Sequence, residues 1–133
     1  MNSQPNVFFS LKAWDEKPYN ELPGELKMTR SSVAYAYQGD IEGASTLDYL
    51  MVYREDGSGS FVGLERVIGS VAGRAGSFVL QHTGTFDQSD VNGTCFVVPQ
   101  SGTGELANLR GEGSISLSGH ADLYPMSFTY HFE

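Results

Sequence analysis

Cysteine is nearly absent from this sequence, since Cys95 is the only one among 133 residues. A single cysteine cannot form an internal disulfide, and it excludes a cysteine-rich zinc site. A free thiol fits a reducing compartment. The surrounding residues, Thr94-Cys95-Phe96-Val97-Val98, are typical of a strand, where a free cysteine is usually a small buried apolar side chain. We therefore expect Cys95 to be buried and unreactive.

Basic residues are also few, with 8 Lys and Arg against 16 Asp and Glu and a net charge of -8. Such a chain repels polyanions, because phosphate binding depends on Lys and Arg. The sequence has no basic cluster, no apolar run near the roughly 20 residues of a spanning helix, and no basic-then-apolar start in Met1-Asn2-Ser3-Gln4-Pro5. We expect no nucleic acid partner, no membrane partner and a cytoplasmic location.

The three histidines offer no metal-ligand spacing. His120 and His131 lie far from any patterned acid, and no His-x-His or His-x-x-x-His pair occurs. The stretch Gly102-Thr103-Gly104 does not lead from a strand into a long helix and lacks a following Lys, so it does not indicate a phosphate-binding loop. We expect no metal and no other cofactor.

Glycine is frequent, with 16 copies, and short runs rich in Val, Phe, Tyr and Thr lie between the glycines. This pattern predicts an all-β chain with strands near residues 6–14, 29–39, 45–54, 59–69, 76–86, 93–99, 111–118 and 124–132. A meander of about eight strands avoids exposed edges by closing on itself. We therefore predict a single closed antiparallel β-barrel domain over residues 1–133.

The connections between these strands are expected to be short, with one exception. Tight turns are predicted at Glu55–Ser58, Val71–Arg74 and residues 87–92. Residues 15–28 contain Pro18 and Pro23 and are predicted to form a long loop after the first strand. The only helix expected is a single turn at residues 105–109.

Four segments resemble a family of small bacterial proteins of unknown function: Trp14–Lys17, Gly39–Gly43, Phe61–Arg66 and Ser77–Gly84. Residues 102–111, Gly-Thr-Gly-Glu-Leu followed by Leu-Arg-Gly, resemble a glycine-rich stretch of allene oxide cyclases and dirigent proteins. That family is grouped with this barrel superfamily. The resemblance implies an eight-stranded barrel. Relatives in the superfamily bind hydrophobic or phenolic molecules inside the barrel and steer cyclisation or coupling, and several are trimers, although fold transfers better than function.

Two hairpins determine which polar residues share a face with the apolar core, because alternate residues of a barrel strand face inward. If Asp56-Gly57 is a two-residue turn, with a positive φ at the glycine, Asp48 lies opposite Glu65. A turn centred on Ala72-Gly73 places His82 one diagonal step from Glu65. A shift of one residue would send His82 to the opposite side from Glu65.

Asp48, Glu65 and His82 then converge, and Glu65 with His82 forms a candidate catalytic pair. A carboxylate within reach of an imidazole can set its tautomer and stabilise its protonated form, which suits general acid–base chemistry. The alternative is that all three lie on a solvated outer face, or that Glu65 pairs with a neighbouring Arg across a strand.

Other aromatic and polar residues could line a ligand pocket. The second face of the same hairpin mixes tyrosines with aliphatic residues and could equally be the interior. Trp14 could stack on a ligand or simply pack, and Glu42 could point into the barrel mouth or be a solvated turn carboxylate. The candidate ligand-binding residues are Trp14, Glu42, Asp48, Tyr49, Tyr53, Arg66 and Gln81.

Both faces of residues 47–53 and 61–68 are apolar enough to bury. A monomeric barrel buries only its inner face, so the second apolar face predicts a dimer or trimer.

Three functions remain open. The first is binding of a small hydrophobic or aromatic molecule inside the barrel. The second is an isomerase-like or cyclase-like enzyme that uses Glu65 and His82. The third is a structural or interaction role for a barrel filled by its own side chains.

Overall fold

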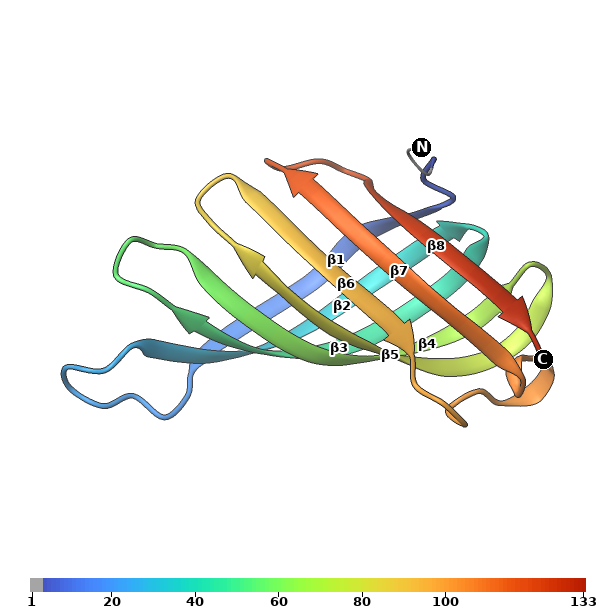
Figure 1. The fold of residues 1–133 in the computed structure, drawn as a ribbon, viewed down its shortest axis with the longest axis horizontal. Helices are drawn as coiled ribbons and strands as arrows, with labels where there is room; N and C mark the ends of the chain where they lie inside the picture. The colour runs from blue at the N-terminus through green and yellow to red at the C-terminus, as the bar shows by residue number, and fades with distance from the viewer. Residues whose placement is uncertain (1–3) are drawn as a thin grey trace.

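The computed structural model describes residues 4–133 and forms a closed antiparallel barrel of eight strands (Figure 1). Each strand pairs with the next in sequence, and the last pairs with the first. The strands are β1 (Val7–Pro18), β2 (Lys27–Gly39), β3 (Ile41–Tyr53), β4 (Gly59–Val71), β5 (Arg74–Phe86), β6 (Asp90–Val97), β7 (Leu109–Ser118) and β8 (Tyr124–Phe132). The predicted fold class is confirmed.

Helix is almost absent from the part of the chain that the structure describes. One 3₁₀ turn, η1 (Gly104–Leu106), lies between β6 and β7, close to the single turn predicted there. Within residues 4–133, no helix has the length and apolar character needed to cross a membrane.

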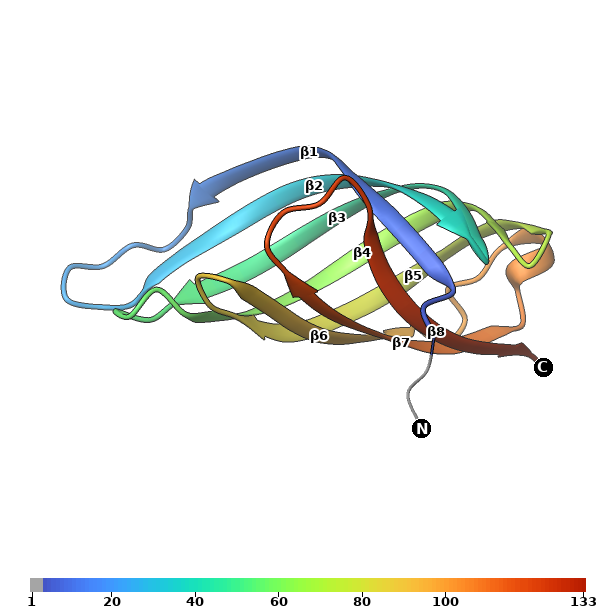
Figure 2. The same cartoon turned by 90° about the horizontal axis from the view of Figure 1, so that it is seen from above.

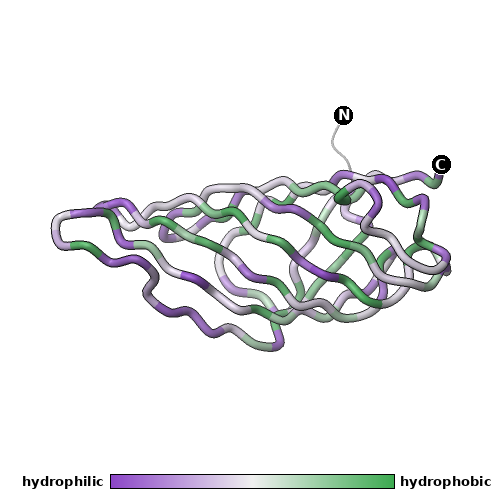
Figure 3. Tube along the Cα trace, turned by 90° about the horizontal axis from the view of Figure 1, so that it is seen from below, coloured by the Kyte–Doolittle hydropathy of each residue, from purple (hydrophilic) through white to green (hydrophobic). Residues whose placement is uncertain are grey.

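Buried and exposed residues alternate along the long strands, as the pleat of a strand requires. In β4, Phe61, Glu65 and Val67 are buried, whereas Val62 and Arg66 are exposed. Figure 3 colours the trace by hydropathy and shows short hydrophobic and hydrophilic stretches interspersed along the strands. The core therefore lies inside the barrel and is built from one face of every strand.

The turn between β4 and β5 has the predicted geometry. Val71 pairs with Arg74, and Ala72 and Gly73 both have positive φ values, 50° and 82°. Two positive φ values are typical of the type I′ turn, whose twist matches that of the flanking strands. The resulting register places His82 opposite Gly63, one diagonal step from Glu65.

The register predicted for β3 and β4 is wrong by one residue. Tyr53 pairs with Gly59, so Arg54–Ser58 forms a loop of five residues rather than a two-residue turn. The Asp56 carboxylate widens this loop by accepting the Ser58 backbone N–H at 2.9 Å. Gly57 has the expected positive φ of 88°. The shift turns Asp48 to the outer face, opposite Leu64.

Residues 15–28 are not one long loop, because β1 continues to Pro18 and only residues 19–26 connect it to β2. The proline is tolerated as the last residue of the strand. Lys12 forms a bulge, since Leu11 pairs with Tyr35 while Ala13 already pairs with Ala34. An extra residue reverses which side chains face inward, and this is why residues 14 and 16 point to the inner face together with residues 7 and 9.

The seam between β1 and β8 is short. Only Val7, Phe8 and Phe9 pair with β8, and the Asn6 side chain extends the seam with two hydrogen bonds of 2.8 Å to the Phe128 backbone. Beyond Phe9, β1 continues without a partner on this side, because Phe9 pairs with Tyr124, the first residue of β8 (Figure 2). We call the end of the barrel where β1 terminates at Pro18 the open end.

The opposite end, which we call the closed end, is sealed by residues 98–108. Thr103 binds the backbone of Ser77 through its own N–H at 2.8 Å and its hydroxyl at 3.0 Å. Leu106 is fully buried. The connection can approach β5 this closely because residue 76 is a glycine: a Cβ there would lie 2.0 Å from the Thr103 carbonyl oxygen. A glycine at residue 76 therefore allows the connection to close the barrel.

Candidate functional site

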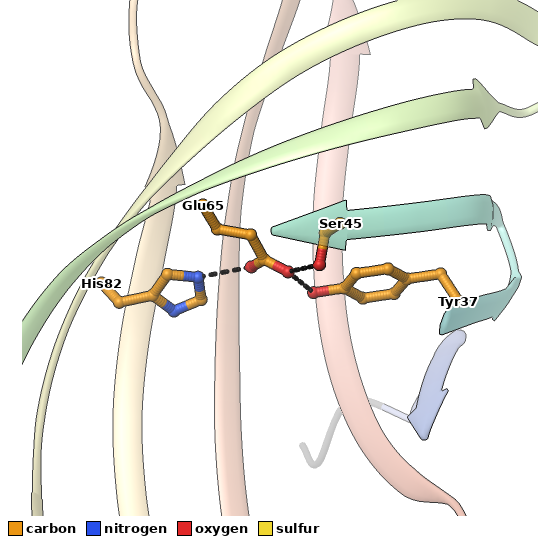
Figure 4. A network of polar contacts seen from close by, with 4 residues as sticks. All are labelled: Tyr37, Ser45, Glu65 and His82. Atoms are coloured by element: carbon orange, nitrogen blue, oxygen red, sulfur yellow. Dashed lines mark hydrogen bonds and ion pairs between the residues drawn. The ribbon is translucent and has the colours of Figure 1, made fainter. Parts of the chain in front are cut away.

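A buried carboxylate lies in the middle of the barrel (Figure 4). Glu65 on β4 is 0% exposed, and His82 on β5 is 8% exposed. The Glu65 Oε1 atom lies 2.7 Å from His82 Nε2. The Tyr37 and Ser45 hydroxyls donate to Glu65 Oε2 at 2.6 Å and 2.5 Å. Three strands, β2, β3 and β5, thus place one polar side chain each around the carboxylate that β4 carries.

These partners explain how a carboxylate can be buried. An unpaired buried charge is strongly destabilising, whereas a charge with hydrogen bonds to all sides is tolerated. Burial, together with the charge and the hydrogen bond of Glu65, raises the pKa of Tyr37 well above its usual value. The Tyr37 hydroxyl therefore stays protonated and remains a donor to the carboxylate.

His82 is held from two directions. The Tyr49 ring lies edge-on to the imidazole at a centroid distance of 6.1 Å, and Cys95 is its partner on β6. Among residues 4–133, no hydrogen bond reaches His82 Nδ1, and no fully enclosed side-chain nitrogen or oxygen lacks a partner. Nδ1 is therefore the imidazole nitrogen that faces accessible space. A histidine with one nitrogen fixed and the other free is suited to proton transfer.

Cys95 behaves as a buried apolar residue beside this site. Burial, with a smaller contribution from the Glu65 charge, raises the pKa of its thiol to about 12. The thiol is therefore protonated at neutral pH and is not a nucleophile.

The Tyr49 ring packs against Gly63 on β4, where there is no side chain. A Cβ at residue 63 would lie 2.7 Å from the Tyr49 ring, so any larger residue would displace it. The absent side chain thus lets the ring lie over β4 and reach His82.

A second polar cluster lies at the open end, around Glu16 on β1. Its Oε1 accepts the Trp14 indole N–H at 3.2 Å, and its Oε2 accepts the hydroxyls of Thr29, at 2.7 Å, and Tyr53. The Lys27 ammonium lies over the Tyr53 ring, 5.1 Å from its centroid. Partial burial opposes ionisation of Glu16, but the hydrogen bonds of Tyr53, Thr29 and Trp14 and the Lys27 charge together lower its pKa.

Aromatic rings connect the two clusters along the inner face. Trp14 lies 6.1 Å from Tyr49, which in turn lies 6.1 Å from His82. Phe86 packs edge-on against Tyr53 at 5.1 Å. The inner face from the open end to Glu65 is therefore an aromatic surface with a carboxylate at each end.

Comparison with known proteins identifies the family of this chain. A family model described as "Protein of unknown function (DUF3224)" matches residues 7–130. The chain belongs to this family. A crystal structure of a DUF3224 protein of unknown function from Shewanella oneidensis MR-1 is similar, with 29% sequence identity, a TM-score of 0.75, and coverage of 98% of this chain and 99% of that chain. No curated protein matches the sequence.

In this DUF3224 barrel, the predicted contact between Glu65 and His82 is present, and Trp14, Tyr49 and Tyr53 all face inward. The predicted convergence of Asp48 with this pair is wrong. The five-residue loop between β3 and β4 moves Asp48 outward, where it binds Ser32 and Arg30 on the outer surface.

Three further candidates also lie outside. Arg66 and Gln81 occupy exposed positions between inward-facing residues, because they alternate with Glu65 and His82 along their strands. Glu42 does not point into a barrel mouth, since it is exposed and pairs with Ser70 while its neighbour Gly43 lies on the inner side. None of the three is a partner of the Glu65 carboxylate, which contacts Tyr37, Ser45 and His82.

Sequence reasoning missed Glu16, Thr29, Tyr37 and Ser45. Glu16 lies within residues 15–28, which their prolines predict to be a loop, and a loop residue has no inward or outward face. Thr29 and Tyr37 belong to an alternating run on β2, in which residues 29, 31, 33, 35 and 37 all face inward. That alternation is visible in the sequence and was sufficient to place both residues on the inner face.

The outer face also carries a broad depression of about 1310 Å³, to which Asp48 and Gln81 contribute. Its apolar lining includes Leu50, Val62, Leu64 and Phe96, whose side chains are exposed. The apolar character expected of both faces of this hairpin is therefore present, and its outer part is uncovered in the single chain.

Proposed function

We propose that this DUF3224 barrel binds a small hydrophobic or aromatic molecule, which enters at the open end. The observation that carries the proposal is the exposure of inward-facing side chains there. Leu11 is 46% and Trp14 is 43% exposed, although both lie on the inner face of β1. Apolar side chains that face inward and yet remain accessible are typical of a ligand site.

Aromatic side chains of the protein itself limit how far a ligand can enter from the open end. Phe61 extends across the inner face, and a Cβ at Gly84 would lie 2.5 Å from its ring. The middle of the barrel is thus filled by its own side chains, as one of the three hypotheses expected. The ligand therefore occupies the inner face at the open end, in the space bounded by Trp14, Tyr49 and Phe61, and Tyr49 lies between this space and His82.

A thermal-shift screen of purified protein with a library of hydrophobic and aromatic compounds tests this proposal. A ligand that binds only the native state must raise the melting temperature. We expect a subset of aromatic compounds to raise it in the native sequence and to lose the effect in Trp14→Ala. A library without any stabilising compound, combined with no co-purified molecule in native mass spectrometry, would leave the self-filled barrel as the better description.

The second candidate function is an isomerase-like or cyclase-like proton transfer by Glu65 and His82. It is favoured by one observation, the accessible Nδ1 atom of an imidazole whose Nε2 is fixed by a buried carboxylate. For this function the ligand would have to reach past Tyr49 to His82, which would take a proton from one atom of the ligand through Nδ1 and return it to another, with no net gain or loss of atoms. The resemblance of residues 102–111 to allene oxide cyclases supports this class of reaction.

We also propose that the chain assembles as a dimer or trimer through its outer face. Leu64 is 57% exposed beside Val62 and Phe96 in the outer depression, and apolar side chains gathered in this way favour an interface. Leu64→Asp should then dissociate the assembly. Light scattering that gives only a mass near 14.5 kDa at micromolar concentration would contradict the proposal.

We propose a cytoplasmic location, supported by the single buried thiol of Cys95, which a reducing compartment keeps free. Fractionation of host cells tests this directly. Recovery of the protein mainly in a secreted fraction would contradict it.

A further inference from the structure

The Glu16 cluster has unused acceptor capacity. An ionised carboxylate offers about four lone-pair sites on its two oxygens. Trp14, Thr29 and Tyr53 occupy three of these, two on Oε2 and one on Oε1. Glu16 is only partly buried, so one lone pair on Oε1 can receive a donor from outside the chain.

Two electron-rich rings lie beside Glu16. Trp14 binds Glu16 directly, and Tyr53 binds it from the other side while packing against Phe86. The faces of such rings attract cations. The Lys27 ammonium, 5.1 Å from the centroid of Tyr53, shows that a positive charge is accommodated at this place. The net charge of -8 further favours a cation over an anion.

The remaining surface of the open end is apolar. Phe61, Phe86 and Val91 lie on the inner faces of β4, β5 and β6, and Met51 packs with them. A ligand that uses both surfaces needs an apolar body and a polar head at the Glu16 end. The two properties together define an amphiphile with a cationic head.

We propose that the open end selects organic ammonium compounds, with the ammonium bound by Glu16 between Trp14 and Tyr53 and the apolar body along Phe61 and Phe86. This inference rests on the proposed ligand-binding function and specifies the class of ligand. Lys27 is the competing charge, because its ammonium could instead attract a ligand carboxylate. Lys27 is exposed at the rim, whereas Glu16 lies further inside and is held by three donors, so the carboxylate determines the selectivity.

Calorimetric titration with three compounds of similar body tests the proposal: phenylbutylamine, phenylbutanol and phenylbutyrate. We expect the amine to bind at least about tenfold more tightly than the alcohol or the acid. Glu16→Gln should remove this preference, since the amide keeps the size of the side chain and loses its charge. Asp15→Asn is the matched control, because it removes the same charge from the neighbouring residue on the outer face, where Asp15 contacts Lys17 at 3.6 Å.

Each result supports or overturns a distinct statement. A preference for the amine that Glu16→Gln abolishes and Asp15→Asn preserves supports the proposal. Equal binding of all three compounds, or an equal effect of the two substitutions, overturns the ammonium selectivity and leaves the ligand-binding function standing. Binding of none of the three, together with no stabilising compound in the thermal-shift library, overturns both.

Discussion

The two ends of this barrel are built from the same strands, yet they bury their inner faces to different degrees. At the closed end, Val7, Ile41 and Phe78 are fully buried, and Leu106 of the β6–β7 connection packs with them. At the open end, Trp14 also faces inward but remains almost half exposed. The difference follows from the seam, which ends at Phe9, and from the connection at residues 98–108, which covers one end only.

This comparison separates stability from function. The closed end removes its apolar surface from water and therefore contributes most of the hydrophobic stabilisation. The open end leaves aromatic surface and the Glu16 carboxylate accessible, which adds little to stability. Substitutions at the two ends should therefore affect different measurements, folding at one and binding at the other.

The largest expected effect is at the closed end. Phe78→Ala should lower the free energy of unfolding by about 3–5 kcal/mol, because it leaves a cavity in a region with no access to solvent. Chemical denaturation measures this change. Trp14→Ala removes a larger ring from the open end and should cost less than half as much; an equal or larger loss for Trp14→Ala would remove the distinction between the two ends.

Glu65→Gln is expected to lower the free energy of unfolding by about 1–3 kcal/mol, because buried hydrogen bonds to a charged acceptor are replaced by neutral ones. The same substitution should change the nitrogen NMR signals of His82, whose Nε2 atom loses its carboxylate partner. Asp48→Asn is the control, because Asp48 was predicted to lie beside Glu65 and His82 but lies on the outer face. Unchanged His82 signals in Glu65→Gln would contradict the pairing.

Alkaline pH should destabilise the protein through its buried acids. The pKa of the Cys95 thiol is raised from 9.0 to about 12 in the folded chain. Between these values the unfolded chain loses a proton that the folded chain keeps, so stability falls as pH rises, by up to about 1.4 kcal/mol per pH unit for this group. Denaturation from pH 8 to 11 measures the slope, which Cys95→Ala should reduce. A slope that does not change in Cys95→Ala would show that other groups cause it.

The smallest effect is expected on the outer face. Asp48 and Arg30 form an exposed pair at 3.4 Å, and such pairs contribute little. Asp48→Asn should therefore change the free energy of unfolding by less than about 0.5 kcal/mol. Denaturation in parallel with Glu65→Gln measures the contrast. Similar losses for the two carboxylates would contradict the assignment of inner and outer faces.

The sequence was sufficient for the fold and for part of the site. Alternating apolar residues and glycine-rich turns predict eight strands, and the Ala72-Gly73 turn is local enough to fix the register that joins Glu65 with His82. The β3–β4 register was not predictable from Asp56-Gly57 alone, because the Asp56 side chain lengthens the loop through its own hydrogen bond.

The Glu16 cluster was not predictable for two reasons, the loop that the prolines of residues 15–28 predict and a bulge in β1. The bulge at Lys12 reverses the inward face of β1, and a bulge depends on how β1 pairs with β2 rather than on its own sequence. Tyr37 and Ser45 reach Glu65 from two other strands, so their contact with it depends on the pairing registers of β2, β3 and β4 together.

The central claim is that the open end, and not the outer depression, binds the ligand. Trp14 is the only tryptophan in the chain and lies at the open end, so its fluorescence reports on this site alone. Acrylamide quenching of Trp14 should be measured with and without a compound that raises the melting temperature. The bound compound should shield Trp14 and reduce the quenching at least about twofold. Stabilisation by the compound with unchanged quenching of Trp14 would contradict this claim.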